Sequence, residues 1–293
     1  MRIKLSKNVG FCWGVRRALD LALHSSSRNA KVYTYGPLIH NENVVEMLKS
    51  KGVEPYSSRK AFKPSRTKIL LLIRAHGVAP AVQKKLASKG LSIVDATCPH
   101  VKKSQKLVQE YAQKGFQIII AGDREHAEVI SLIGYAKDKK KSNVIVIGSS
   151  KEAKSLFKDS QKPLKKKICL LAQSTFQPGL YLDIVKTIKR KVAPQTEVEI
   201  LNTICQAPAR RQEAVKDLAN NVDAIIVVGD HSSANTTNLT LLARSLRIPA
   251  FQVASASELP VSKLKKYSSI GIATGTSTPD SDIEEVVKVI SEL

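Results

Sequence analysis

The sequence is poor in cysteine and in long hydrophobic runs, and each shortage excludes a class of protein. Four cysteines in 293 residues, with no Cys-x-x-Cys pair, argue against a disulfide-stabilised scaffold and against a zinc finger. The longest apolar runs, at residues 69–73 and 116–120, fall far short of the ~20 residues of a membrane-spanning helix. No continuous apolar segment of the secretory type follows the basic start of the chain. We therefore expect a cytoplasmic protein, whose reducing surroundings leave thiols available for metal.

Acidic and aromatic residues are also scarce. The chain has 25 Asp and Glu against 47 Lys and Arg, a formal charge of +22, and 5% of its residues are aromatic. The lysines are scattered over clusters such as residues 139–141 and 165–167, without the interleaved aromatic side chains typical of nucleic-acid-binding surfaces. A solvated basic surface, or one that attracts acidic substrates or acidic redox partners, remains as the interpretation of this charge.

What the sequence does contain is one unit repeated three times. Cys12, Cys98 and Cys205 each follow a strand-like run, precede a helical pattern, and lie about a third of the chain apart. Each of these helical patterns leads to a strand, expected at residues 31–35, 116–121 and 224–228, which ends in a polar cluster that opens another helix. A further apolar strand follows in each copy, at residues 69–73, 168–171 and 270–273. This spacing indicates a threefold internal repeat.

The repeat predicts the fold. The last helix, from about residue 280, has no strand after it, so we expect the strand at residues 2–5 to complete the third unit. The predicted domains are residues 13–98, residues 99–204, and residues 205–293 completed by residues 1–12. The fold class is α/β, with three small domains of mostly parallel sheets in a pseudo-threefold arrangement around a central iron–sulfur site. The alternative is a single large doubly wound sheet, which would spread the cysteines along one edge.

The central site is expected to be metallic because three thiols recur in register. Ligands bind at the carboxyl ends of parallel strands, where all three cysteines fall. Three thiolates can hold three irons of a cubane cluster, which normally takes four, and the fourth iron is then open to a substrate oxygen. The helix that follows each Cys favours a negatively charged cluster at its N-terminus. Cys169 lies inside a strand with no turn beside it, and we leave it out of the site.

The polar groups at the other strand ends suit an anion of the phosphate type. They are three histidines and three neutral hydrogen-bond donors: His40, His76, His126, Ser233, Asn235 and Ser277. Neither a Walker A loop nor a Gly-x-Gly-x-x-Gly sequence is present, so a nucleotide site of either common kind is not expected. Glu128, two residues after His126, can relay protons to a leaving hydroxyl.

Taken together and in order, the motifs of the chain are highly specific. They are Gly10-Phe11-Cys12-x-Gly14-Val15, His40-Asn41, Ala75-His76-Gly77-Val78, Asp95-Ala96-Thr97-Cys98-Pro99, His126-Ala127-Glu128-Val129, Thr203-Ile204-Cys205, Arg211-Gln212-Glu213-Ala214, Ser233-Ala234-Asn235 and Ser277-Thr278-Pro279. Over essentially its whole length the sequence resembles the 4-hydroxy-3-methylbut-2-enyl diphosphate reductase family (LytB/IspH).

The resemblance implies a three-domain enzyme of the non-mevalonate isoprenoid pathway with one [4Fe-4S] cluster per chain. Such an enzyme removes the allylic hydroxyl of its substrate with two electrons and two protons and gives isopentenyl and dimethylallyl diphosphates. By position, Cys12, Cys98 and Cys205 would hold the cluster, and Glu128 would donate the proton. The implied catalytic and substrate-binding residues are Glu128, Ser174, His126, His40, His76, Ser233, Ala234, Asn235 and Ser277. An acidic electron donor such as a ferredoxin or flavodoxin is the implied partner.

Four positions depart from the usual family pattern. Ser174 stands where the family usually has Thr, which keeps the hydroxyl beside the substrate oxygen. Ala234 replaces a frequent Ser and Ala127 a frequent Pro. Pro208 stands where the family often has Thr, so one phosphate-binding hydroxyl is missing, and a lost hydrogen bond to a charged group is worth about 1.5 to 3 kcal/mol.

Two other functions stay open at this point. A dehydratase resembling quinolinate synthase also uses three α/β domains and three cysteines, but it would do non-redox chemistry at the open iron. The Glu128 and Ser174 pair with the His-rich cradle favours the reductase. The +22 charge motivates the other alternative, a basic RNA-associated protein that is not an enzyme and has structural thiols.

Overall fold

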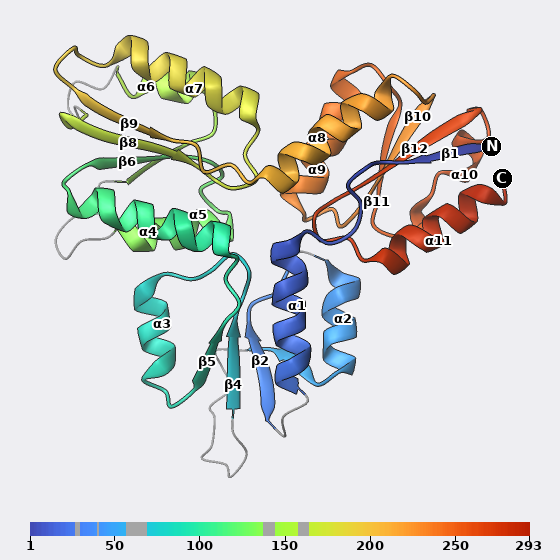
Figure 1. The fold of residues 1–293 in the computed structure, drawn as a ribbon, viewed down its shortest axis with the longest axis horizontal. Coiled ribbons are helices and arrows are strands. Elements are labelled where there is room, and N and C mark those ends of the chain that lie inside the picture. The colour runs from blue at the N-terminus through green and yellow to red at the C-terminus, as the bar shows by residue number, and fades with distance from the viewer. Residues whose placement is uncertain (27–29, 40, 57–68, 137–143, 158–163) are drawn as a thin grey trace. The chain divides into compact units, whose positions relative to one another are not determined.

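The computed structural model describes residues 1–26, 30–39, 41–56, 69–136, 144–157 and 164–293. The chain forms two compact units. Unit 1 comprises Met1–Ser27, Pro37–Pro55 and Gln206–Leu293, and unit 2 comprises Arg28–Gly36 and Tyr56–Cys205. Each unit is described by itself below, with the element labels of Figure 1.

Helices alternate with strands along the described chain (Figure 1). The helices of unit 1 are α1 (Trp13–Ser26), α2 (Glu42–Ser50), α8 (Gln206–Ala219), α9 (Ala234–Ser245), η1 (Ala256–Glu258), α10 (Val261–Leu264) and α11 (Asp280–Ser291). Those of unit 2 are α3 (Pro80–Ala87), α4 (Pro99–Gln113), α5 (Ala127–Ala136), α6 (Ser150–Ser155) and α7 (Pro178–Lys191).

Three four-stranded sheets share one strand order. In unit 1 the order is β1 (Arg2–Leu5), β12 (Ser269–Thr274), β10 (Ala224–Val228), β11 (Ala250–Val253). In unit 2 one sheet has the order β7 (Val144–Ile147), β6 (Gln117–Ala121), β8 (Lys167–Ala172), β9 (Glu197–Leu201). The remaining sheet has the order β3 (Val53–Pro55), β2 (Lys31–Tyr35), β4 (Ile69–Ile73), β5 (Ser92–Asp95). All pairings with a described register are parallel, which confirms the α/β class.

The N-terminal strand completes the last sheet, as the repeat predicts. β1 pairs in parallel with β12, with Arg2 opposite Ser269 and Leu5 opposite Ile272. Counted along each repeat, the fourth strand is always an edge strand that leads to a Cys: β5 to Cys98, β9 to Cys205 and β1 to Cys12. Although its fourth strand comes from the start of the chain, the third sheet therefore has the same topology as the other two.

The central strands β6, β8, β10 and β12 are mostly apolar because helices cover both of their faces. In β10, Ile225 and Val227 face the cluster that includes Val215 of α8 and Leu239 of α9. The alternate residues, Ile226 and Val228, face the opposite cluster, which includes Val286 of α11. In unit 2, β6 and β8 divide in the same way between a cluster with α4 and α5 and one with α6 and α7 (Figure 1). Each of these two sheets is therefore packed between two layers of helices, which fixes where its strands end.

The three sheets match the three predicted repeats, whereas the contacts of the chain divide it into two units. The predicted domain boundaries and the pseudo-threefold arrangement stay predictions. None of the helices in the described part of the chain is long and apolar enough to cross a bilayer.

Candidate functional site

Each of three cysteines lies between the end of an edge strand and the first residue of a helix. Cys12 precedes α1, Cys98 precedes α4, and Cys205 precedes α8. The main-chain N–H of each donates to a carbonyl two residues beyond the end of the neighbouring strand. The acceptors are Thr276 O for Cys12 at 3.0 Å, Ala75 O for Cys98 at 2.9 Å and Ser174 O for Cys205 at 2.8 Å. The three thiols therefore occupy the same structural position in the three repeats.

Two of these cysteines follow the same local turn. The Asp95 carboxylate accepts a hydrogen bond from the Thr97 amide at 2.9 Å, and the Asn202 side chain accepts one from the Ile204 amide at 3.2 Å. Such Asx turns reverse the chain within two residues. Because the turn comes three residues before each Cys, it delivers both thiols at the same point after their strands.

The helices that follow the cysteines begin without a carboxylate. In α1, α4 and α8, all described along their full length, the first turn contains no acidic residue. The helix dipole favours acidic side chains there, and they are present in the first turns of α2, α5, α6 and α11. They are missing from those of α3, α7, α9 and α10 as well, so this feature is shared with helices that follow no cysteine. An anion bound at the three helix starts would be repelled by such carboxylates, so the pattern fits a negatively charged ligand.

The accessibility of the thiols separates Cys169 from the other three. All four cysteines are thiols rather than disulfides, and Cys12, Cys98 and Cys205 are half-buried. Cys169 is fully buried in β8, and burial raises its pKa to about 12, so its reactive thiolate form is scarce. Within the described residues, no three His, Cys, Asp or Glu side chains gather as a metal site. The fit to an iron–sulfur cluster therefore rests on the chemistry and equivalence of the three half-buried thiols.

In unit 2, two of the predicted histidines lie together. The rings of His76 and His126 stand edge to face with their centroids 5.2 Å apart. The turn after His76 needs glycine, because Gly77 has a φ of +72° and a side chain there would collide with the amide of Gln105 on α4. Gln105 in turn donates to the Ser131 hydroxyl of α5 at 2.8 Å. Packing against both helices therefore fixes the direction of the His76 turn.

Glu128 is a buried carboxyl group held by one partner residue. Its side chain is 1% exposed, in the first turn of α5. Oε1 accepts the main-chain N–H of Ser174 at 2.8 Å, and Oε2 accepts the Ser174 hydroxyl at 2.6 Å. Burial raises the pKa of Glu128, and the two hydrogen bonds from Ser174 offset only part of that shift. A carboxyl group of this kind keeps its proton to higher pH than an exposed one and is suited to act as a general acid.

A chain of contacts joins these groups within unit 2. The Nδ1 atom of His126 accepts the main-chain N–H of Glu128 at 3.2 Å, which places the ring proton on Nε2. Ser174, which holds Glu128, also accepts the Cys205 amide through its carbonyl. On the other side, His126 contacts His76, whose neighbour Ala75 accepts the Cys98 amide. Two thiol positions, two histidines and the buried acid therefore belong to one connected network.

In unit 1 the predicted polar residues lie at the start of α9. Ser233 is the N-cap of this helix and accepts a hydrogen bond from the Thr236 amide at 3.4 Å. Asn235 and Thr236 are buried, and neither Asn235 Nδ2 nor Thr236 Oγ1 has a hydrogen-bond partner among the described residues. Buried polar groups in native proteins are nearly always paired, so these two point to a ligand that is not part of the chain. A helix N-terminus is also where anions bind most readily.

The loop that carries Ser277 packs against the same helix start. A side chain at Gly275 would collide with the Thr236 hydroxyl, and one at Gly229 would meet it at 2.6 Å. Thr278 closes this loop by donating from its hydroxyl to the Val228 carbonyl at 2.8 Å. The two glycines thus let the β10 and β12 loops approach α9 closely.

Two carboxylates that the sequence did not single out anchor the start of α2, next to Asn41. Asp230 accepts the Glu42 amide at 3.1 Å, and Asp282 accepts side-chain hydrogen bonds from Asn43 and Asn41. A pocket of about 460 Å³ opens beside them, lined by residues of α2 and of the β10–α9 loop. One sequence signal could have found Asp230, because Gly229-Asp230 repeats the Gly122-Asp123 pair that ends β6.

The remaining predicted residues have mixed outcomes. His40 lies outside the described residues. Ser277 is buried and Ala234 half-buried, while Pro208 lies buried in the first turn of α8, where proline is tolerated. Thr236 was not among the predicted site residues, and its unpaired hydroxyl is visible only in the folded protein.

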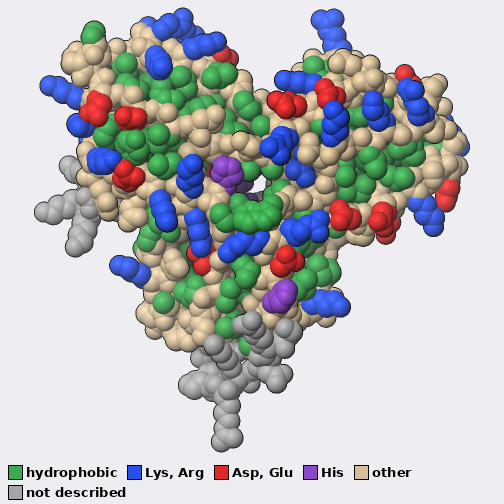
Figure 2. Space-filling view, viewed as in Figure 1, with side chains coloured by type: hydrophobic (Ala, Val, Ile, Leu, Met, Phe, Trp, Pro, Cys, Tyr) green, Lys and Arg blue, Asp and Glu red, His purple; other side chains and the backbone are tan. Residues whose placement is uncertain are grey.

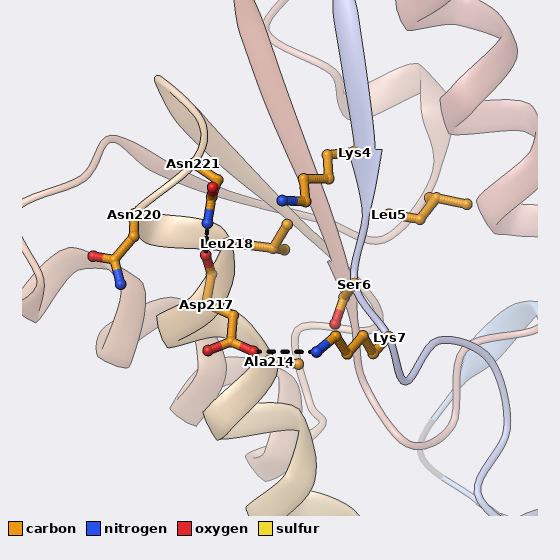
Figure 3. Close-up of a pocket in the computed structure, with 9 residues that line it drawn as sticks. All are labelled: Lys4, Leu5, Ser6, Lys7, Ala214, Asp217, Leu218, Asn220 and Asn221. Carbon is orange, nitrogen blue, oxygen red and sulfur yellow. Dashed lines mark hydrogen bonds and ion pairs between the residues drawn. The ribbon is translucent and has the colours of Figure 1, made fainter.

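A second pocket in unit 1, of about 220 Å³, contains none of the predicted site residues (Figure 3). It lies between β1 and the end of α8. The Lys7 ammonium approaches the Asp217 carboxylate to 3.8 Å, and the Asn221 amide donates to the Asp217 carbonyl at 2.7 Å (Figure 3). Because the Lys7 and Asp217 side chains are mostly exposed, this ion pair contributes little to stability.

The chain matches a known protein family over nearly its whole length. The family model described as "LytB protein" matches residues 3–291. The 4-hydroxy-3-methylbut-2-enyl diphosphate reductase of Clostridioides difficile (strain 630) is 38% identical over 294 residues, which cover 100% of both chains. The enzyme of that name from Treponema denticola is 36% identical over 301 residues, again across the full length of both.

Two solved structures are also similar. A structure titled as (E)-4-hydroxy-3-methyl-but-2-enyl diphosphate reductase, the terminal enzyme of the non-mevalonate pathway, is 34% identical, with a TM-score of 0.70 and 100% of both chains covered. The E-1-hydroxy-2-methyl-but-2-enyl-4-diphosphate reductase from Plasmodium falciparum is 25% identical, with a TM-score of 0.86, and the match covers 98% of this chain and 87% of that one.

Proposed function

The chain belongs to the LytB protein family, and on that premise we propose that it reduces 4-hydroxy-3-methylbut-2-enyl diphosphate to isopentenyl and dimethylallyl diphosphates. In this reaction the allylic C–O bond breaks and a C–H bond forms. Two electrons and two protons enter, the hydroxyl leaves as water, and the diphosphate is unchanged. The observation that carries the proposal is the buried Glu128 carboxyl, held by Ser174 within the network that connects two of the thiol positions.

The proposed cofactor is one [4Fe-4S] cluster per chain, held by Cys12, Cys98 and Cys205. The support is the equivalent placement of the three thiols and the absence of acidic residues from the first turns of α1, α4 and α8. Such a cluster, when bound, supplies electrons at low potential and a Lewis-acidic iron. The Cys169 thiol is fully buried, which argues against such a role for it.

Glu128 is proposed to deliver the proton that leaves with the hydroxyl. Its raised pKa keeps the carboxyl protonated in a range where an exposed Glu would be ionised. Ser174 fixes both carboxyl oxygens and keeps its own hydroxyl at the same place, as the Thr usual in the family would. His126 orients the first turn of α5 through its contact with the Glu128 amide and offers its Nε2–H to the substrate.

The diphosphate is proposed to bind at the start of α9. Asn235 Nδ2 and Thr236 Oγ1 are buried donors without a partner among the described residues, and the Ser233 cap lies beside them. The first turn of α9 contains no acidic residue, so the positive end of the helix dipole is not neutralised there. Further donors proposed for the same anion are His40, His76, Ser277 and the backbone at Ala234.

The electron donor is proposed to be an acidic ferredoxin or flavodoxin. The chain has no nicotinamide-binding sequence of the common kind, and its charge of +22 would attract an acidic protein. A cytoplasmic location is proposed with it, because reduced thiols and a low-potential protein donor both belong to that compartment.

The two alternatives raised by the sequence are less well supported. Family membership and full-length similarity to named reductases favour reduction over a quinolinate-synthase-like dehydration. For an RNA-associated protein, a concentrated basic patch would be expected, whereas Figure 2 shows Lys and Arg side chains spread over the visible face, intermixed with acidic ones.

Anaerobic turnover tests the proposal. The protein, purified without oxygen and carrying about four irons per chain, is mixed with the hydroxy diphosphate and reduced methyl viologen, and the products are identified by mass spectrometry. We expect both isoprenoid diphosphates, and no product from a Cys98→Ser variant that has lost its iron. Iron-loaded wild-type protein that leaves the substrate intact would contradict the proposal.

A further inference from the structure

The single tryptophan of the chain lies exposed next to a proposed cluster ligand. Trp13 directly follows Cys12, begins α1, and is 68% exposed. It is the most exposed of the large hydrophobic side chains in the described residues. Exposing an indole to water is unfavourable, since burying it elsewhere would remove a large apolar surface from solvent. An indole exposed at this position is available for a contact with another protein.

Helical spacing places basic side chains on the same face as Trp13. Arg16 and Arg17 are three and four residues further along α1, so they lie beside the indole on the helix surface. The opposite face of α1, which includes Ala18 and Ala22, is buried. Arg16 forms a loose ion pair with Asp280, in which the nearest atoms are 3.7 Å apart and both side chains remain largely exposed. We call Trp13, Arg16 and Arg17 the α1 face.

The surroundings of the α1 face in the sequence are strongly basic. The first twenty residues contain five Lys and Arg and one acidic residue, Asp20. An apolar aromatic flanked by arginines has the composition of a protein-binding hot spot, where Trp and Arg are enriched. The charge selects an acidic partner, because opposite charge accelerates encounter and like charge suppresses it.

We infer that the α1 face is the docking site of the acidic one-electron donor protein, an inference that rests on the proposed function. Each turnover consumes two electrons, so a one-electron donor must dock, pass one electron to the protein and leave oxidised, twice per product. A donor docked at Trp13 would lie next to Cys12, because the two residues are consecutive in the chain. Complexes of this type are small, often burying less than about 1,200 Å² in total, so that one aromatic anchor and two arginines are a sufficient core.

Binding can be read directly from Trp13. Because the chain has one tryptophan, fluorescence excited at 295 nm reports this position alone when the probe is a small acidic ferredoxin that lacks tryptophan. Titrating the iron-loaded protein with this ferredoxin should change the emission saturably. The dissociation constant should rise steeply between low salt and about 0.5 M salt, where the Debye length is well below 10 Å.

Two variants and two matched controls complete the test. By calorimetry, Trp13→Ala and Arg16→Gln should weaken ferredoxin binding by about 10- to 100-fold and 3- to 10-fold respectively, as for hot-spot residues. Leu182→Ala and Arg190→Gln, an exposed apolar and an exposed basic residue on α7 of unit 2, should bind like wild type. All four should keep wild-type iron content and wild-type turnover with reduced methyl viologen, which needs no docking.

The outcomes separate the docking inference from the proposed function. Suppose that Trp13→Ala and Arg16→Gln bind ferredoxin like wild type and that the wild type turns over with methyl viologen. This result would overturn docking at the α1 face and leave the proposed reductase function standing. Weakening of the controls to the same extent would also overturn it, because the docking would then follow net charge alone. Absence of turnover with methyl viologen in the wild type would overturn the proposed function and the inference with it.

Discussion

The carboxyl group of Glu128 receives both of its hydrogen bonds from one residue, Ser174, which lies 46 positions further along the chain. The main-chain N–H of Ser174 binds one oxygen and its hydroxyl binds the other, so the acid cannot rotate without breaking both bonds. Because the same residue accepts the Cys205 amide, the acid and a proposed cluster ligand are held by a single peptide segment. Ser174 therefore links the Glu128 carboxyl to the backbone of Cys205.

This relationship predicts how Ser174→Ala changes the pH profile. Burial raises the pKa of Glu128, and the Ser174 hydroxyl lowers it, so removing the hydroxyl should raise the pKa further. If the protonated carboxyl is the active form, turnover falls as the pH rises through this pKa. The alkaline limb of the kcat profile, measured with reduced methyl viologen, should move to higher pH in Ser174→Ala and stay near its wild-type position in Ser174→Thr. A limb that moves to lower pH in the Ala variant would contradict the assignment.

Three of the four thiols should react with an alkylating reagent in the folded protein, and Cys169 should not. In the reduced, iron-free protein, Cys12, Cys98 and Cys205 are half-buried, whereas Cys169 is fully buried with its pKa raised to about 12. Iodoacetamide at neutral pH should therefore label three cysteines quickly and the fourth only after unfolding, as counted by mass spectrometry.

The matched variants test the same division in the iron-loaded protein. Cys169→Ala should keep its iron and its activity and lose about 1 to 2 kcal/mol of unfolding free energy, because it removes atoms from a packed core. Cys12→Ser, Cys98→Ser and Cys205→Ser should each lose the cluster. Equal iron loss in Cys169→Ala and Cys12→Ser would show that the wrong three cysteines were chosen.

Asn235→Ala should weaken substrate binding more than it slows the reaction. A hydrogen bond to a charged group contributes about 1.5 to 3 kcal/mol, which corresponds to a rise in KM of about 10- to 150-fold. The effect on kcat should be small, since the diphosphate is unchanged in the reaction. Inhibition by inorganic pyrophosphate should weaken in parallel. Asn220→Ala, at the exposed end of α8, is the control, and an unchanged KM in Asn235→Ala would exclude this side chain from the anion site.

Local patterns were sufficient to predict most of the framework. The strands at residues 31–35, 69–73 and 224–228 are observed as predicted. The last two are uninterrupted apolar runs, as is typical of buried parallel strands. The pairing of β1 with β12 could also be predicted, because a strand without a helix and a helix without a strand complete each other in a repeat. The strands β3, β7 and β11 were not located. β3 has three residues and β11 is interrupted by Gln252, whereas the Val-Ile-Val-Ile run of β7 is as apolar as a central strand and could have been identified.

The site was only partly predictable for a different reason. The motifs place Glu128 and Ser174 in the segments that follow two strands, but burial of the carboxyl results from the packing of α5 against its neighbours and has no local signature. Asp230 binds the amide of Glu42 from 188 positions away, a contact that no spacing rule reveals. The unpaired groups of Asn235 and Thr236 likewise become informative only once the fold shows that they are buried.

The most direct test of the central claim is a single turnover of Glu128→Gln. Glutamine matches glutamate in size, and it can accept the Ser174 N–H while donating to the Ser174 hydroxyl, so the local structure should persist. It cannot deliver a proton. We predict that the reduced, iron-loaded variant keeps its cluster spectrum and binds the hydroxy diphosphate, but forms product about 10² to 10⁴ times more slowly than wild type. Product formation at nearly the wild-type rate, with only a lower melting temperature, would contradict the account and leave Glu128 as a structural carboxyl group at the start of α5.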